Sequence, residues 1–209
     1  MIFQDRRDAG RRLAELLTEY KENKDAIVIG LPRGGVIVAA EVAKQLKLPL
    51  DILCPRKLGA PYQPELAIGA VTETGEGIFN EDLLAALGVT NSYLQNIINK
   101  EKQVAQQRAK LYRNGRPPLN LENKITILID DGLATGATMK AALATAKALG
   151  AAKIVVAIPV APVDTLEEIR SMVDEVKCLQ APYPFHAVGA FYTDFSQTED
   201  DEVIKLLCS

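Results

Sequence analysis

Short apolar runs alternate along the chain with longer segments in which apolar residues recur at helical spacing. The apolar runs cover residues 26–30, 50–54, 66–72, 77–80, 125–130, 153–159 and 175–179. The segments with helical spacing lie at 8–20, 36–46, 81–113, 136–150, 163–173 and 199–207. Strands that are apolar on both faces are typical of a parallel sheet covered by helices. We therefore predict an α/β fold with a central, mostly parallel sheet flanked by helices.

The length of 209 residues fits a single domain spanning 1–209. The segment 81–118 is a long polar helical stretch between two strands, and Asn114-Gly115 and the following proline pair end it. We interpret this stretch as a helical insertion into the strand–helix alternation. Ligands of such sheets bind where the parallel strands end, so the loops after the strands are where function is expected.

Composition and charge narrow the function classes. The net charge is −3 and the pI is about 5.4, which disfavours a nucleic-acid partner because phosphate binding needs clustered positive charge. The three cysteines are far apart and form neither a zinc motif nor a disulfide framework. No apolar run approaches 18 residues, so no membrane contact is expected. The N-terminus does not read as a signal peptide, so we expect a cytoplasmic location.

The strongest chemical signal follows the apolar run 125–130. Two adjacent carboxylates, Asp130 and Asp131, end the strand, and a loop of small and hydroxyl residues then opens a helix. Backbone N–H groups at a helix start cradle phosphate, whereas carboxylates accept hydrogen bonds from sugar hydroxyls. The pattern indicates a sugar phosphate, with an ordinary strand–turn–helix as the alternative. The predicted phosphate-binding residues are Ala134, Thr135, Gly136, Ala137 and Thr138.

Two further loops bring cations to strand ends. Arg33-Gly34-Gly35 follows the first strand, and Arg56-Lys57 follows the second. Glycine exposes backbone N–H groups and arginine offers several fixed donors, so both loops suit a pyrophosphate. The alternatives are a turn that needs glycine for its shape and, for Lys57, a solvated surface side chain.

The motif IDDGLATGAT resembles the characteristic motif of the type I phosphoribosyltransferases, and the resemblance extends over roughly residues 8–195. It implies that Asp130 and Asp131 hold the ribose of phosphoribosyl pyrophosphate and that the loop 134–138 wraps its 5-phosphate. It further implies that the loop 33–35 and the Arg56-Lys57 pair bind the pyrophosphate. In the family a mobile loop follows, here residues 59–65, in which Glu65 is either a lid residue or a surface charge.

The same resemblance assigns the segment 182–209 to a small hood on the base side of the site. It implies that Phe185 stacks on the acceptor ring and that Asp194 lies near the metal, although the spacing around Gly189 is one residue longer on each side. We expect His186 to be structural, because no partner is evident. The stretch 157–162 lacks the lysine with which purine enzymes read a 6-oxo group, which argues against a hypoxanthine or guanine acceptor.

The implied reaction is transfer of the phosphoribosyl group to a nitrogenous base or related small acceptor, with release of pyrophosphate. The implied cofactor is Mg²⁺, and a homodimer is common in the family. Two alternatives stay open. One is a regulatory module that binds phosphoribosyl pyrophosphate without transferring it, and the other is a sugar-phosphate or nucleotide hydrolase.

Overall fold

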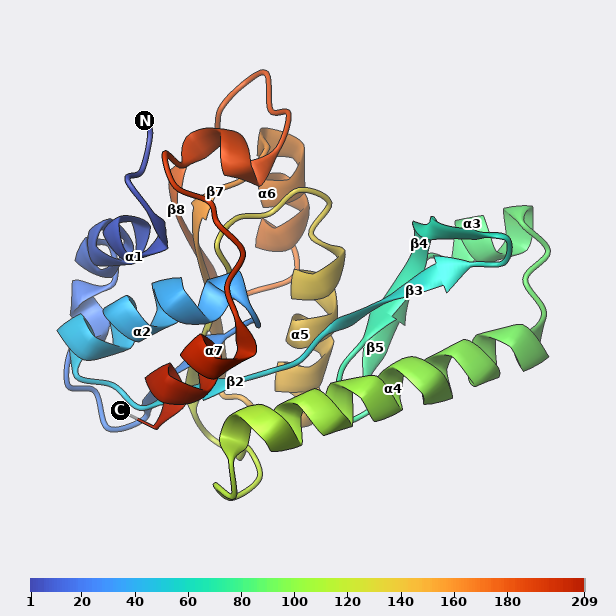
Figure 1. Ribbon diagram of the computed structural model, residues 1–209, viewed down its shortest axis with the longest axis horizontal. Helices are drawn as coiled ribbons and strands as arrows, with labels where there is room; N and C mark the ends of the chain where they lie inside the picture. The colour runs from blue at the N-terminus through green and yellow to red at the C-terminus, as the bar shows by residue number, and fades with distance from the viewer. Residues whose placement is uncertain (209) are drawn as a thin grey trace.

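A five-stranded parallel sheet forms the centre of the protein in the computed structural model, which describes residues 1–208 (Figure 1). The strand order is β2-β1-β6-β7-β8, and every neighbouring pair is parallel. The strands are β1 (Ala26–Gly30), β2 (Leu50–Ile52), β6 (Ile125–Ile129), β7 (Lys153–Val160) and β8 (Glu175–Gln180). The structure thus confirms the predicted α/β fold and its central parallel sheet.

Helices cover both faces of this sheet, which explains why its inner strands β1, β6 and β7 are largely apolar. On one face, Ile127 and Ile129 of β6 pack with α1 (Arg6–Glu15) and α2 (Gly34–Leu46). On the other face, Leu128 packs with the helices α5 (Ala137–Ala148) and α6 (Val163–Arg170). Successive side chains of a strand point to opposite faces, so a strand between two helical layers must be apolar at every position.

A second, antiparallel sheet projects from this body beside the long helix α4 (Figure 1). Its strands pair in the order β3-β4-β5. Its face packs apolar residues, among them Leu58 and Ile68, against the first half of α4. The elements of this region are β3 (Arg56–Ala60), β4 (Gln63–Val71), β5 (Gly77–Phe79), α3 (Glu81–Ala86) and α4 (Asn91–Arg113).

This region corrects three predictions. The expected strand 50–54 ends at Ile52, and the expected loop 54–59 is mostly strand β3. Residues 59–65, the expected mobile cover, include the turn of the β3–β4 hairpin, so their role as a cover stays a prediction, and the side chain of Glu65 lies outside the described part. The expected helix 81–113 is two helices, because Gly88 adopts a left-handed φ of 60° and Thr90 caps α4 by accepting a hydrogen bond from the Tyr93 N–H.

The C-terminal segment returns across the carboxyl end of the sheet. It contains the short 3₁₀ helix η2 (Val188–Phe191) and ends in the helix α7 (Asp200–Leu207). Phe3 and Tyr192 form an isolated parallel bridge, so the start of the chain lies beside this segment. The expected helix 8–20 is α1 followed by the 3₁₀ turn η1 (Thr18–Tyr20). Within residues 1–208, no helix is long and apolar enough to cross a membrane.

Candidate functional site

The two acidic residues lie at the carboxyl end of β6, near the middle of the parallel sheet. The loop that follows β1 packs directly onto them. A Cβ added to Gly34 would collide with Oδ2 of Asp131, and one added to Gly35 would lie 2.8 Å from Cα of Asp130. These two positions therefore require glycine, and the structure brings the acidic pair and the glycine pair together as one site.

Arg6 from the N-terminal helix is the nearest counter-charge of the pair. Its Nε donates a hydrogen bond to Oδ2 of Asp131 at 2.7 Å, and the Arg6 side chain is only 11% exposed. The Tyr192 hydroxyl donates to the backbone carbonyl of Asp131 at 2.5 Å. The acidic loop is thus fixed from α1 and from the C-terminal segment at the same time.

The negative charge of the two carboxylates is poorly compensated by nearby cations. Burial raises the pKa of Asp130 well above its usual value, and the adjacent Asp131 charge raises it further. Burial also raises the pKa of Asp131, although the hydrogen bond and charge of Arg6 oppose that shift. The Asp131 N–H donates to Oδ1 of Asp130 at 2.8 Å. Two carboxylates share one arginine, so the site has spare capacity to accept hydrogen bonds.

The predicted phosphate loop leads directly into α5. Gly136 caps the helix with a left-handed φ of 72°, which a residue with a side chain rarely adopts. Two hydrogen bonds hold the loop in place: the Leu133 N–H donates to the Val160 carbonyl, and the Thr165 hydroxyl donates to the Ala134 carbonyl. Ala134 and Thr135 are exposed, whereas Ala137 and Thr138 are half-buried in the first turn of the helix. The loop is preformed, with its free N–H groups at a helix start.

The predicted basic residues occupy two different places. Arg33 lies in the loop before α2, and its Nη1 is 3.7 Å from Oδ1 of Asp200 at the start of α7. Arg56 lies in β3, where its Nε donates to Glu101 at 2.9 Å. Arg56 and the exposed Lys57 line a hollow of about 400 Å³ between β3 and α4. The structure therefore places the loop that contains Arg33 beside the acidic pair. The pyrophosphate role of Arg56 and Lys57 stays a prediction.

The hood residues are engaged in packing. Phe185 stacks on Phe191 with ring centroids 5.5 Å apart and an interplanar angle of 21°. Both belong to an apolar cluster around Phe3 and Tyr192, so Phe185 is half-buried in the protein itself. His186 is exposed. The stacking of Phe185 on an acceptor ring remains a prediction.

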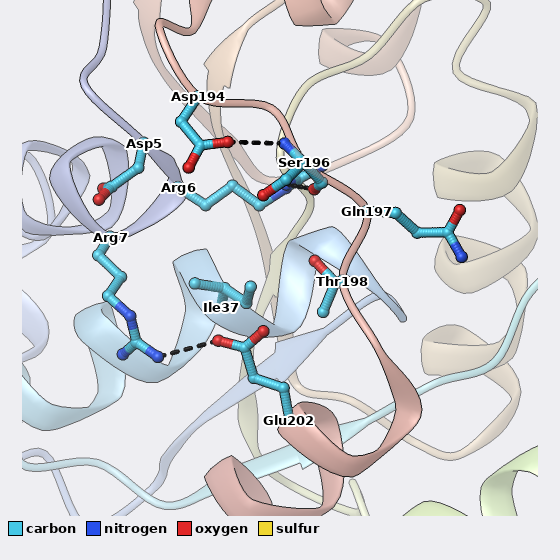
Figure 2. A pocket seen from close by; sticks show the side chains of 9 residues that line it. All are labelled: Asp5, Arg6, Arg7, Ile37, Asp194, Ser196, Gln197, Thr198 and Glu202. Atoms are coloured by element: carbon cyan, nitrogen blue, oxygen red, sulfur yellow. Dashed lines mark hydrogen bonds and ion pairs between the residues drawn. The ribbon is translucent and has the colours of Figure 1, made fainter.

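Asp194 lies at a small polar pocket next to Arg6 (Figure 2). Its Oδ1 accepts a hydrogen bond from the Ser196 N–H at 2.9 Å, which lowers the pKa of this exposed carboxyl. The pocket has a volume of about 140 Å³. Its buried Thr198 hydroxyl has no hydrogen-bond partner among the described residues. The lining residues are Asp5, Arg6, Arg7, Ile37, Asp194, Ser196, Gln197, Thr198 and Glu202.

The donor set does not form a metal site by itself. Residues 1–208 contain no group of three or more His, Cys, Asp or Glu side chains arranged to hold a metal ion. Mg²⁺ usually keeps several waters and binds through one or two carboxylates together with substrate phosphates. The acidic residues here suit that mode, in which most ligands come from the substrate. The metal role of Asp194 stays a prediction.

Sequence reasoning missed three residues of the site: Arg6, Tyr192 and Asp200. Each acts across the fold, as in the Arg6–Asp131 contact, which joins residues 125 positions apart. One local signal was present. Arg6 and Arg7 stand in the first turn of α1, where the helix dipole disfavours cations, so an acidic partner elsewhere was to be expected.

Comparison with known proteins identifies the family. A model of the phosphoribosyl transferase domain matches residues 2–195. The chain is 46% identical over 206 residues to a Mycobacterium tuberculosis protein named "Putative phosphoribosyl transferase Rv0571c". That match covers 99% of this chain and 46% of the relative, so the chain spans about half the length of the curated relatives it matches.

A solved structure shares the whole fold. The crystal structure of TT1426 from Thermus thermophilus superimposes with a TM-score of 0.85 at 42% sequence identity. The superposition covers 99% of this chain and 98% of that chain, so it includes the antiparallel sheet and the C-terminal segment as well as the central sheet. Together with the domain match and the acidic loop, it shows that this chain belongs to the phosphoribosyl transferase domain family.

Proposed function

We propose that this protein binds phosphoribosyl pyrophosphate and transfers its phosphoribosyl group to a nitrogenous base or a related small acceptor. The observation that carries this proposal is the under-compensated pair Asp130 and Asp131, packed against Gly34-Gly35 beside the start of α5. Two carboxylates with raised pKa values call for donors from a ligand, and neighbouring ribose hydroxyls supply two of them.

The helix starts support the assignment of the two phosphate ends. The first turns of α2 and α5 contain no acidic residue, whereas α1, α3, α6 and α7 each carry one or more there. The helix α4 also lacks one, but it begins at the far end of the projecting antiparallel sheet, away from the central sheet (Figure 1). An acidic side chain at the starts of α2 and α5 would occupy the position that an anion needs. We assign the 5-phosphate to the loop 134–138 before α5 and the pyrophosphate to the loop 33–35 before α2.

The chemistry then requires orientation more than covalent participation. The bond between C1 of the ribose and the pyrophosphate oxygen breaks, and a bond from C1 to an acceptor nitrogen forms. Positive charge develops at the ribose, as in glycoside cleavage, so the adjacent carboxylates stabilise it. Arg33 compensates the charge of the departing pyrophosphate. Asp130 and Asp131 are the residues that would hold Mg²⁺ together with the substrate, and the ion would supply positive charge that stabilises the departing pyrophosphate.

One observation favours a second candidate, a module that binds the donor without transferring it. Phe185 is stacked on Phe191 rather than open to an acceptor ring. Both candidates share every donor-site residue, so they differ only in whether an acceptor site works.

Pyrophosphate release distinguishes these functions. The protein, Mg²⁺ and phosphoribosyl pyrophosphate are incubated with a panel of purine, pyrimidine and pyridine bases, and with no base. Release that depends on a base supports transfer, and the product identifies the acceptor. Donor binding with no release across the panel supports the regulatory module. Equal release without a base supports a hydrolase and contradicts the proposal.

A further inference from the structure

Arg6 connects three parts of the chain that are far apart in sequence. Its Nε donates to Oδ2 of Asp131, and its Nη1 donates to the backbone carbonyl of Ser196, each at 2.7 Å. Its guanidinium carbon lies 3.9 Å from the ring centroid of Phe195. Figure 2 shows the Arg6 side chain extending from the N-terminal segment towards Ser196. A planar guanidinium held by an ion pair, a carbonyl and an aromatic face has little freedom to turn.

Its neighbour Arg7 provides a comparison within one helical turn. Arg7 pairs with Glu41 at 3.2 Å and with Glu202 at 3.0 Å, and its side chain is 42% exposed, against 11% for Arg6. Exposed pairs of this kind contribute little to stability. Both arginines stand in the first turn of α1, where the helix dipole disfavours a cation. Arg6 is in addition largely out of solvent, so its position is the costlier one, and Asp131 is the charge that compensates it.

We propose that Arg6 is a positioning residue for donor binding, because it fixes the Asp131 carboxylate through one oxygen and leaves the other to accept a ribose hydroxyl. This inference rests on the proposed function. The charged and titratable groups that face Asp131 are Arg6, the adjacent Asp130 and the Tyr192 phenol. Asp194 faces Arg6 from the pocket side. Without Arg6, the nearest charge to Asp131 is the like charge of Asp130, which would turn the carboxylate away.

The first test compares three variants by calorimetric titration with phosphoribosyl pyrophosphate and Mg²⁺. Arg6→Met removes the charge and keeps the stem, and we expect a roughly ten- to thirtyfold loss of affinity. Arg6→Lys keeps the charge but not the planar guanidinium that reaches both Asp131 and Ser196, so it should recover part of the lost affinity. Arg7→Met is the matched control, with affinity within about twofold of the unchanged protein. Equal affinities of Arg6→Met and Arg7→Met would overturn the inference, and so would failure of Arg6→Lys to restore any binding.

The second test is a double-variant cycle with Asp131→Asn, read by donor affinity and by urea unfolding of the ligand-free protein. If Arg6 acts through Asp131, Arg6→Met should change affinity by less than about twofold once Asp131→Asn is present. Additive losses would overturn the inference. The unfolding cycle needs no donor. If the two substitutions are coupled in the free energy of unfolding but the unchanged protein does not bind the donor, the proposed function is rejected and the Arg6–Asp131 ion pair is retained. Donor binding without coupling would reject the Arg6 inference alone.

Discussion

The two ends of the parallel sheet surround their carboxylates in opposite ways: the half-buried Glu175 at the amino end has several donors, and the more deeply buried acidic pair at the carboxyl end has few. At the amino end, Glu175 of β8 accepts hydrogen bonds from Lys153 at 2.8 Å and from the Tyr20 hydroxyl at 2.5 Å, and Lys177 lies 2.7 Å from its other oxygen. At the carboxyl end, Asp130 and Asp131 share the single cation Arg6.

The pKa values follow this difference. Burial alone would raise the pKa of Glu175, but the hydrogen bonds from Lys153, Lys177 and Tyr20 lower it to about 2. Burial also raises the pKa of Asp130, and the charge of Asp131 adds to that increase. One end of the sheet satisfies its carboxylate with its own donors, and the other keeps carboxylates that need donors from outside. We infer that the amino-end carboxylate contributes to stability, and the unsatisfied pair at the carboxyl end is where we propose that the ligand binds.

The largest expected effect comes from forcing apart the two site loops, which pack closely at Gly34. Gly34→Ala places a Cβ against the Asp131 carboxylate and Arg6, so donor affinity should fall by more than about a hundredfold. Calorimetric titration with phosphoribosyl pyrophosphate measures this. The control is Gly115→Ala, whose added Cβ meets no atom within 4 Å. This control should lose about 1 kcal/mol of stability because its φ is positive, and it should bind the donor normally. Normal donor binding by Gly34→Ala would show that the glycine contact does not form the site.

A substitution at the amino end of the sheet should change stability and leave donor binding unchanged. The lowered pKa of Glu175 means that its contribution is present above the unfolded value of 4.5 and is lost as the pH falls towards 2. Its side chain is 24% exposed, so we expect Glu175→Gln to cost roughly 1–2 kcal/mol at pH 7. Urea unfolding at a series of pH values checks this. The cost should shrink between pH 5 and pH 2, and a cost independent of pH would contradict the assignment.

The stability contribution of Asp130 should change with pH in the opposite direction. Its raised pKa means that ionisation opposes folding, so the stability associated with its neutral form is lost as the pH rises through the folded value. Asp130→Asn keeps an oxygen for the Asp131 N–H and should stabilise the protein by about 1 kcal/mol at pH 8 while weakening donor binding. Thermal unfolding at pH 4 and pH 8 measures the gain, which should nearly vanish at pH 4. Destabilisation at pH 8 would show that the carboxylate is structural.

The smallest expected effect concerns Arg33. Asp200 lies 3.7 Å from its guanidinium and also accepts a hydrogen bond from the Tyr112 hydroxyl at 2.6 Å. Asp200→Asn keeps an acceptor for the tyrosine but removes a charge that competes with a bound anion. We expect inorganic pyrophosphate to bind about two- to threefold more tightly at low salt, with the gain lost at high salt. A loss of affinity would show instead that Asp200 holds Arg33 in its binding position.

The fold was largely predictable because its central strands are buried on both faces. Runs such as Ile125–Ile129 are apolar at nearly every position, and no other environment suits them. Most of β4 was expected as the strand 66–72, whereas β3 and the turn between the two strands were missed because only one face of this hairpin is buried. Leu58 and Ala60 point inward between exposed or half-buried neighbours, and prolines at 61 and 64 suggested a loop.

The site was predictable only where its residues are consecutive in sequence. The acidic pair, the proposed phosphate loop and the glycine pair are local motifs, because the ligand contacts that we propose for each of them come from neighbouring residues. Arg6 and Tyr192 reach Asp131 from opposite ends of the chain, and the residues around them in the sequence do not identify Asp131 as the partner.

The central claim is that the acidic pair at the carboxyl end, and not the carboxylate at the amino end, receives the ribose. The most direct measurement is a calorimetric titration of phosphoribosyl pyrophosphate with Mg²⁺ into the unchanged protein, Asp131→Asn and Glu175→Gln. We predict binding by the unchanged protein, a roughly ten- to hundredfold loss in Asp131→Asn and less than about a twofold change in Glu175→Gln. Equal affinities in the two variants, or no binding by the unchanged protein, would contradict the account.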